Sequence, residues 1–417
     1  MKKLWITLCI AMLSLALLTT ASAITSGDYE YELLLDGTAQ ITGYLGEAEV
    51  LTLPADLDGY AVTSIGAFVF EKCGSLTGVI VPEGVTALAA NAFAGMDKLT
   101  SVSLPDSLRF IGENAFCECS SLTDVTIPGG VTGIEALTFT DCIALTNVTL
   151  GHGVTMIGYS AFWNCKSLTS ITIPDSMTSI DSSAFEGCTS LTGVTLPEGL
   201  RMLGFDAFGE CSSLTSVNIP NSVVSMTLNP FTRCSALQTI DVSPDHPVFA
   251  FIDGVLFNKP ERKLIWYSPA KADAEYTVPQ GVAVIGQDAF GHCSSLRKVT
   301  LPQGITQIEK LAFQDCTNLQ KINIPEGVTS IADGTFRGCS SLTSVTLPSS
   351  LTRIWDEAFA GCYSLTSVTL PREMDHISND AFEDCGQVTL HVSTNSYGHR
   401  FAINHSIPFT RYDSTVN

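Results

Sequence analysis

The chain has 417 residues and is acidic, since 42 Asp and Glu against 21 Lys and Arg give a formal net charge of −21 at pH 7. Nucleic-acid phosphates are bound by clusters of Lys and Arg, so this balance argues against a nucleic-acid-binding protein. The motifs H-E-x-x-H and G-x-S-x-G of hydrolytic enzymes and the D-x-D-x-D-G calcium loop are absent. We therefore expect a protein that is not an enzyme and holds no metal ion or other cofactor.

Residues 1–23 have the pattern of a secretory signal peptide. Lys2 and Lys3 precede an apolar run over 4–18, and Ala21-Ser22-Ala23 forms a small-x-small cleavage site. The apolar run is too short for a good membrane span, and no long apolar run follows it. We expect a secreted or cell-surface protein without a membrane span after cleavage, with 19 basic and 42 acidic residues left and a net charge of −23.

Residues 24–61 are expected to form an N-terminal cap or lead-in, and a 23-residue repeat follows over 62–235 and 276–386. Phenylalanines mark the repeat, and every step between them is 23 except one of 59, from Phe231 to Phe290. A fixed period in this range predicts a solenoid of stacked units. The thirteen marker residues are Phe70, Phe93, Phe116, Phe139, Phe162, Phe185, Phe208, Phe231, Phe290, Phe313, Phe336, Phe359 and Phe382.

The unit reads L-x-x-V-x-L/I-P-x-x-V/L-x-x-I-x-x-x-A-F-x-x-C. Around Val345 and Leu347, apolar and polar residues alternate, which is typical of a short strand with one buried face. The spacing from Ile354 to Phe359 and Cys362 is close to one face of a helical turn. We predict an α/β repeat solenoid of 13 coils, each a short strand plus a helical turn, capped at both ends. Coils stacked about 4.8 Å apart would make a rod on the order of 60 Å long.

The motifs "SLTSVTLP", "IPEGVTSI" and "AFAGC" make the chain resemble the BspA-like leucine-rich repeats, a bacterial-type 23-residue class, from about Leu51 to Cys385. The asparagine ladder of better-known leucine-rich repeats is missing, because Gly130, Gly199 or Ser350 stands at its position. The resemblance implies a non-catalytic binding protein outside the cell that acts in adhesion or protein–protein interaction. The alternatives are a structural component of an envelope assembly and an accessory protein that binds polysaccharide.

Cysteines end most repeats, and we consider three roles for them. A ladder of buried free thiols is favoured, because Met96 replaces the cysteine in the second coil. Disulfides between neighbouring coils and metal binding are the alternatives. Cys117 is out of phase and is expected to be an exposed, reactive thiol. The phased residues are Cys73, Cys119, Cys142, Cys165, Cys188, Cys211, Cys234, Cys293, Cys316, Cys339, Cys362 and Cys385.

Residues 236–275 interrupt the array. Asp253-Gly254 lies between apolar runs and predicts a hairpin, and 264–267 reads as a further strand. The segment is either an irregular coil that stays in the stack or a specialised binding element, since interruptions of repeats often form functional loops. After the last repeat, residues 387–417 are expected to fold over the final coil as a C-terminal cap.

Positive charge gathers beside this insert. Residues 259–321 hold eight of the 19 basic residues left after signal cleavage and only six acids. Lys298 and Lys321 take the same strand position in successive coils and should project side by side. We predict a binding surface for an extracellular protein with an acidic patch or for an anionic glycan, formed by Lys298, Lys321, Lys263, Arg262, Trp266 and Tyr267. The weaker candidate is the threonine-lined strand face of the N-terminal coils, with Thr126, Thr149, Thr172 and Thr195.

Overall fold

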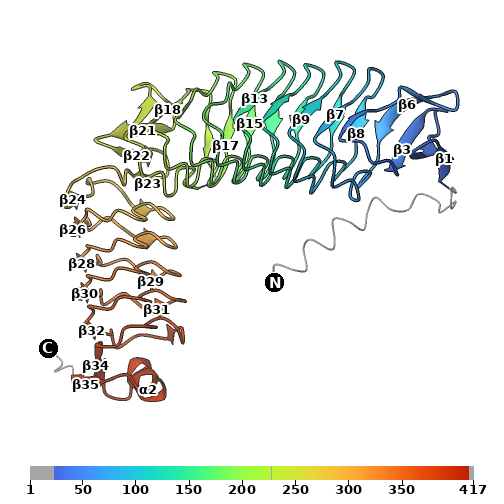
Figure 1. Ribbon diagram of the computed structural model, residues 1–417. Helices are drawn as coiled ribbons and strands as arrows, with labels where there is room; N and C mark the ends of the chain where they lie inside the picture. The colour runs from blue at the N-terminus through green and yellow to red at the C-terminus, as the bar shows by residue number, and fades with distance from the viewer. Residues whose placement is uncertain (1–22, 227, 413–417) are drawn as a thin grey trace.

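The computed structural model describes residues 23–226 and 228–412. The expected signal peptide lies almost entirely outside these residues. Figure 1 shows two straight stacks of coils that meet at a sharp bend, so the molecule is L-shaped and differs from the single rod expected. We call the stack up to Val242 the N-terminal arm and the stack from Glu275 the C-terminal arm. The bend coincides with the insert.

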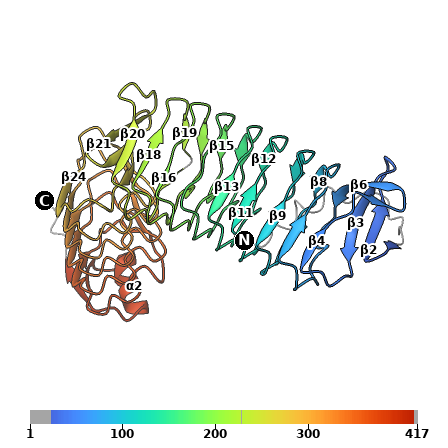
Figure 2. The same cartoon turned by 45° about the horizontal axis from the view of Figure 1, so that its top comes forward.

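The first strand of each coil in the N-terminal arm contributes to one side of the stack, which Figure 2 shows with its strands side by side. Neighbouring strands pair in parallel, β4 with β7 at an offset of 28 residues and the later strands at 23; Val125, for example, pairs with Val148. One coil has only isolated bridges at Ser170 and Thr172 in place of a strand. The strands are β4 (Val50–Thr52), β7 (Gly78–Ile80), β9 (Ser101–Ser103), β11 (Asp124–Thr126), β13 (Asn147–Thr149), β16 (Gly193–Val194), β18 (Ser216–Ile219) and β20 (Thr239–Val242).

A second strand, of two residues in all coils but the first, follows and builds another parallel sheet. An antiparallel edge at the N-terminal end of this sheet caps the stack and consists of β1 (Ile24–Ser26), β2 (Tyr29–Leu33) and β3 (Ala39–Tyr44). The short strand β5 (Asp56–Leu57) pairs with β6. The second strands are β6 (Tyr60–Ile65), β8 (Ala87–Leu88), β10 (Phe110–Ile111), β12 (Gly133–Ile134), β14 (Met156–Ile157), β15 (Ser179–Ile180), β17 (Met202–Leu203) and β19 (Ser225–Met226).

The third side of each coil carries the repeated phenylalanine. The rings are buried and stack on one another; the centroids of Phe116 and Phe139 are 5.3 Å apart with an interplanar angle of 2°. The predicted helical turn is not confirmed, because this segment is a series of hydrogen-bonded turns. Asn114 and Glu118, two residues before and after Phe116, have left-handed backbone (φ 56° and 62°), and most coils repeat this pattern. Two such residues within five interrupt a right-handed helix.

Main-chain bonds to the next coil replace the bonds that a helix would make. The Phe116 N–H, for example, donates to the Thr138 carbonyl at 2.9 Å. The phased cysteines complete this pattern: the Cys188 thiol donates to the Phe162 carbonyl of the preceding coil at 3.3 Å, and equivalent bonds recur along both arms. All twelve are buried, and none of the cysteines in the described residues forms a disulfide. The favoured ladder of free thiols is therefore what the structure contains.

The insert forms the bend. Its strands β21 (Phe249–Ile252), β22 (Val255–Asn258) and β23 (Lys263–Tyr267) make an antiparallel meander, and β23 then pairs in parallel with the second strand of the next coil. Side chains of β23 serve two separate hydrophobic cores: Trp266 packs in the core of the N-terminal arm and Tyr267 in that of the C-terminal arm. The segment 236–275 also includes β20, which still belongs to the sheet of the N-terminal arm.

The C-terminal arm repeats the same construction. Helix α2 (Tyr397–Asn404), the only helix in the described residues, packs on the last coil with β35 and closes the stack. First strands are β24 (Glu275–Thr277), β26 (Lys298–Thr300), β28 (Lys321–Asn323), β30 (Ser344–Thr346), β32 (Ser367–Thr369), β34 (Thr389–Ser393) and β35 (Phe409–Tyr412). Second strands are β25 (Val284–Ile285), β27 (Gln307–Ile308), β29 (Ser330–Ile331), β31 (Arg353–Ile354) and β33 (His376–Ile377).

The solenoid has about 16 turns rather than thirteen. The phenylalanine marker misses the first turn, the insert and the turns of the C-terminal cap, because these lack the A-F-x-x-C segment while their strands continue the ladder.

Candidate functional site

The two lysines singled out from the sequence lie side by side on the first strands of the C-terminal arm. Lys298 of β26 pairs in register with Lys321 of β28, and both side chains are exposed. Lys298 has an ion pair with Glu275 at 3.3 Å, in which both partners are more than half exposed. Lys321 has no ion-pair partner among the described residues. One cation of the pair is therefore available to a ligand without breaking an existing contact.

These lysines border a depression of about 530 Å³, which we call the C-arm groove. Its one carboxylate, Glu326, already accepts hydrogen bonds from the backbone N–H groups of Ser349 and Ser350 and from the Ser349 hydroxyl. These bonds lower the pKa of Glu326, so it stays ionised, and they hold its carboxylate against the next coil. The groove is lined by Lys298, Val299, Thr300, Leu301, Gln303, Lys321, Ile322, Asn323, Ile324, Pro325, Glu326 and Thr346.

The other predicted binding residues do not join this surface. Trp266 and Tyr267 are each 1% exposed, so their assignment to a binding surface is corrected: they are core residues. The Trp266 ring lies edge-on to Phe231 at 6.1 Å, and the Tyr267 ring stacks on Phe290 at 5.2 Å. Tyr267 thereby takes the place of the phenylalanine that the insert lacks.

Lys263 and Arg262 stand beside the sheet of second strands, whereas Lys298 and Lys321 stand on the sheet of first strands. Lys263 is mostly buried and pairs with Glu309 at 2.8 Å. Arg262 is exposed, and its Nε donates to the Gly281 carbonyl at 2.7 Å. Lys263 therefore ties the insert to the C-terminal arm, and only Arg262 of this pair is on the surface.

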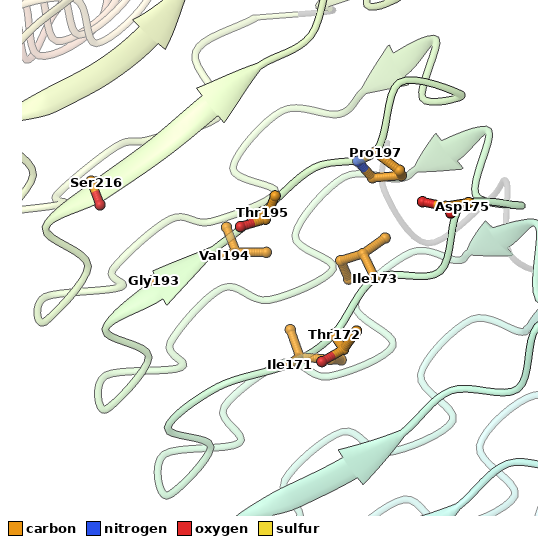
Figure 3. Close-up of a pocket in the computed structure, with 9 residues that line it drawn as sticks. All are labelled: Ile171, Thr172, Ile173, Asp175, Gly193, Val194, Thr195, Pro197 and Ser216. Carbon is orange, nitrogen blue, oxygen red and sulfur yellow. The ribbon is translucent and has the colours of Figure 1, made fainter.

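The threonine-lined face of the N-terminal arm carries a groove of its own (Figure 3), of about 420 Å³, which we call the N-arm groove. Gly193 stands where the neighbouring coils carry Ser170 and Ser216, and the space above it is empty. The repeat pattern did not predict this gap. The glycine at position 193, in a row of positions that mostly carry polar side chains, could have indicated it. The groove contains no basic residue and is lined by Ile171, Thr172, Ile173, Asp175, Gly193, Val194, Thr195, Pro197 and Ser216.

Cys117 is half-buried on the turn side of its coil. Burial, with a smaller contribution from Glu118 and Asp141, raises the pKa of this thiol to about 11. The thiolate is the reactive species, so the thiol is accessible in part but little ionised at neutral pH. Its reactivity stays a prediction.

No group of three or more His, Cys, Asp or Glu in residues 23–226 and 228–412 is arranged to hold a metal ion. Within those ranges no helix combines the length and apolar composition of a membrane span.

Three segments, 57–169, 155–251 and 273–389, match the model of the BspA type leucine rich repeat region. A leucine rich cell surface protein from Faecalibacterium prausnitzii has a similar structure, with 32% identity, a TM-score of 0.72 and coverage of 92% of this chain and 97% of that chain. A leucine-rich repeat protein from Bacteroides ovatus (23% identity, TM-score 0.52, coverage 94% and 100%) shares the fold. So does the pneumococcal vaccine antigen PcpA (19% identity, TM-score 0.57, coverage 95% and 99%). A search of curated proteins found no match.

The matched segments span most of the chain, and the similarity to the Faecalibacterium protein extends over nearly the whole of both chains. The chain therefore belongs to the BspA-type leucine-rich repeat family.

Proposed function

We propose that this protein is a non-catalytic binding protein of the cell surface or extracellular space, and that it holds an acidic protein partner or an anionic glycan in the C-arm groove. Family membership and the similarity to a bacterial cell surface protein support a role in protein binding at the cell surface. An adhesive role is the most direct use of such a long, rigid scaffold.

The observation that carries the proposal is the register pairing of Lys298 with Lys321. Like charges held directly opposite each other in a sheet are unfavourable, and an anion placed between them relieves this repulsion. Thr300 and Thr346 line the same groove and offer hydroxyl groups to the ligand. Glu326, the one carboxylate of the groove, is held by hydrogen bonds from Ser349 and Ser350, and the other lining residues are apolar or amide. Two lysines against one carboxylate leave the groove net positive in a protein that is otherwise strongly acidic.

The test is a charge-reversal pair, Lys298→Glu with Lys321→Glu, measured for binding to polyglutamate and to hyaluronan. The charge reversal should weaken the dependence of affinity on salt, since fewer opposite charges meet in the complex, and affinity at low salt should fall by at least tenfold. A matched control changes the net charge equally: Lys98→Glu with Lys166→Glu alters two exposed lysines of the N-terminal arm.

The control variant should bind as the wild type does. Equal loss of binding in both variants would show that net charge alone attracts the anions. If the Lys298/Lys321 variant melts normally and binds unchanged, the C-arm groove is not the site, and the N-arm groove becomes the better candidate.

A further inference from the structure

A second depression lies at the bend, on the turn side, where the last coils of the N-terminal arm meet the first coil after the insert. We call it the joint pocket; its volume is about 110 Å³. The two sides are 59 residues apart in sequence but touch directly, since Arg233 Nε donates to His292 Nε2 at 2.8 Å. The pocket is lined by Glu186, Phe205, Asp206, Glu210, Thr232, Arg233, Gln287, Asp288, Leu311 and Gln314.

Asp288 lines the joint pocket with an unsatisfied carboxylate. Asp288 is 7% exposed, and no donor in the described residues contacts either of its carboxylate oxygens. Asp206, which faces it from the other arm, accepts a bond from the Thr232 hydroxyl. A buried carboxylate without a hydrogen-bonded or charged partner is strongly destabilising. The pocket thus holds a carboxylate that no donor of the described residues satisfies, although the donors Arg233, Gln287 and Gln314 also line it.

The surrounding charges do not supply the missing partner. Arg233 is the one cationic side chain that lines the pocket, and it is already bound to Glu210 and His292. His292 in turn faces Asp315 at 3.6 Å, and Glu186 and Glu210 add negative charge at the rim. Burial first, and the mutual repulsion of the two carboxylates second, raises the pKa of Asp288 to about 8. Burial likewise raises the pKa of Asp206 to about 7.

A bound cation would neutralise the two carboxylates. The arrangement of the lining residues limits which kind of cation can bind. A compact metal ion needs several ligands that converge on one point, whereas no such group exists among the described residues. An ammonium or guanidinium group carries several N–H donors and reaches carboxylates that lie apart. Phe205 at the edge provides an aromatic surface beside the acids, as cation recognition often uses.

We propose that the joint pocket is a second binding site, which takes an organic cation, an ammonium or guanidinium group, between Asp206 of the N-terminal arm and Asp288 of the C-terminal arm. The site is opposite in sign to the C-arm groove and independent of it. The cation comes either from a free amine or from a lysine or arginine side chain of a protein partner.

The test is calorimetric titration of the whole protein with methylguanidinium and with methylammonium in phosphate buffer and in a buffer of larger ionisation enthalpy. Because binding favours the ionised carboxylates, about one proton should be released per cation near pH 7.5. Because binding needs ionised Asp288, whose pKa is about 8, affinity should be on the order of fiftyfold weaker at pH 6 than at pH 8, or weaker still. Asp288→Asn, which keeps the shape of the side chain, should abolish binding, and Asp206→Asn should weaken it.

Asp97→Asn, at an exposed site in the N-terminal arm, serves as the matched control and should bind as the wild type does. A peptide with a single central arginine distinguishes the two sources: tighter binding than methylguanidinium indicates a protein partner, and equal binding indicates a free amine. The proposal is overturned if neither cation binds at pH 8, if binding is as tight at pH 6, or if Asp288→Asn leaves it unchanged.

Discussion

The two arms have the same coils but differ strongly in surface charge. Residues 24–242 carry six basic and 24 acidic residues, a net charge of −18, whereas residues 243–417 carry 13 basic and 18 acidic residues, a net charge of −5. The buried positions, phenylalanine, cysteine and the strand valines, are shared by both arms. The repeat thus specifies the scaffold through its inward residues, while its outward residues are free to differ and distinguish one arm from the other.

The largest expected effects concern the shared core. Phe185→Ala in the N-terminal arm and Phe359→Ala in the C-terminal arm should each lower the free energy of unfolding by about 3–5 kcal/mol, since each deletes a fully buried ring from the stack. Phe110→Ala, at a side chain that is 48% exposed, should change it by less than about 1 kcal/mol.

The same variants show whether the arms are separate units. Because the cores are distinct, hydrogen exchange should accelerate chiefly in the arm that carries the substitution. Equal acceleration in both arms after Phe359→Ala would mean that the insert couples them into one cooperative structure.

The second effect arises where the arms meet. An unfolded Asp titrates near pH 4, whereas burial raises the pKa of Asp288 to about 8. Between these values the folded state holds a proton that the unfolded state has lost, so stability is full below about pH 4 and falls as pH rises to 8. At pH 8, Asp288→Asn should be more stable than the wild type by on the order of 1–2 kcal/mol. Chemical unfolding at pH 5 and pH 8 measures this, and a variant less stable at pH 8 would contradict it.

A smaller effect separates two lysines of the C-terminal arm. Lys263 is mostly buried against Glu309, so Lys263→Ala should lower the free energy of unfolding by about 1–2 kcal/mol. The ion pair of Lys298 with Glu275 is exposed, and Lys298→Ala should cost less than about 0.5 kcal/mol. Thermal melts of the two variants make the comparison; equal losses would show that Lys298 is structural as well.

The smallest effect is expected at Cys117. Its replacement by serine should shift stability by no more than about 0.5 kcal/mol, because the side chain is half-buried at a variable position. In a native thiol titration it should react alone and slowly, faster as pH rises toward 11. The phased thiols should react after denaturation without a reductant. A wild type in which several thiols react in the native state would contradict their burial.

The sequence predicted the repeating elements, and within the insert it predicted the hairpin at Asp253-Gly254 and the strand at 264–267, but it missed the bend that the insert makes. Period and alternation predicted the strands, the buried phenylalanines and the register of Lys298 with Lys321, because all three follow from in-phase stacking. The helical turn was not confirmed, since the decisive property is the left-handed backbone at residues such as Glu118, a conformation that apolar spacing does not encode.

The insert shows the same limit at the candidate site. Its aromatic residues suggested a contact surface, yet Trp266 and Tyr267 replace the missing phenylalanine and fill two cores at the bend. The sequence did not identify Asp206 and Asp288 as a candidate site, because their coils come together only through tertiary packing across the insert. The 23-residue period of the sequence cannot predict sites that form by such packing.

The central claim is that the C-arm groove, and not the equivalent face of the N-terminal arm, holds an anionic partner. Lysine acetylation footprinting of the whole protein, with and without bound polyglutamate, tests it most directly. Lys298 and Lys321 should be protected at least several-fold on binding, while Lys98 and Lys166 should be acetylated at unchanged rates. Unchanged labelling of Lys321 in a saturated complex, or equal protection of all four lysines, would contradict the claim.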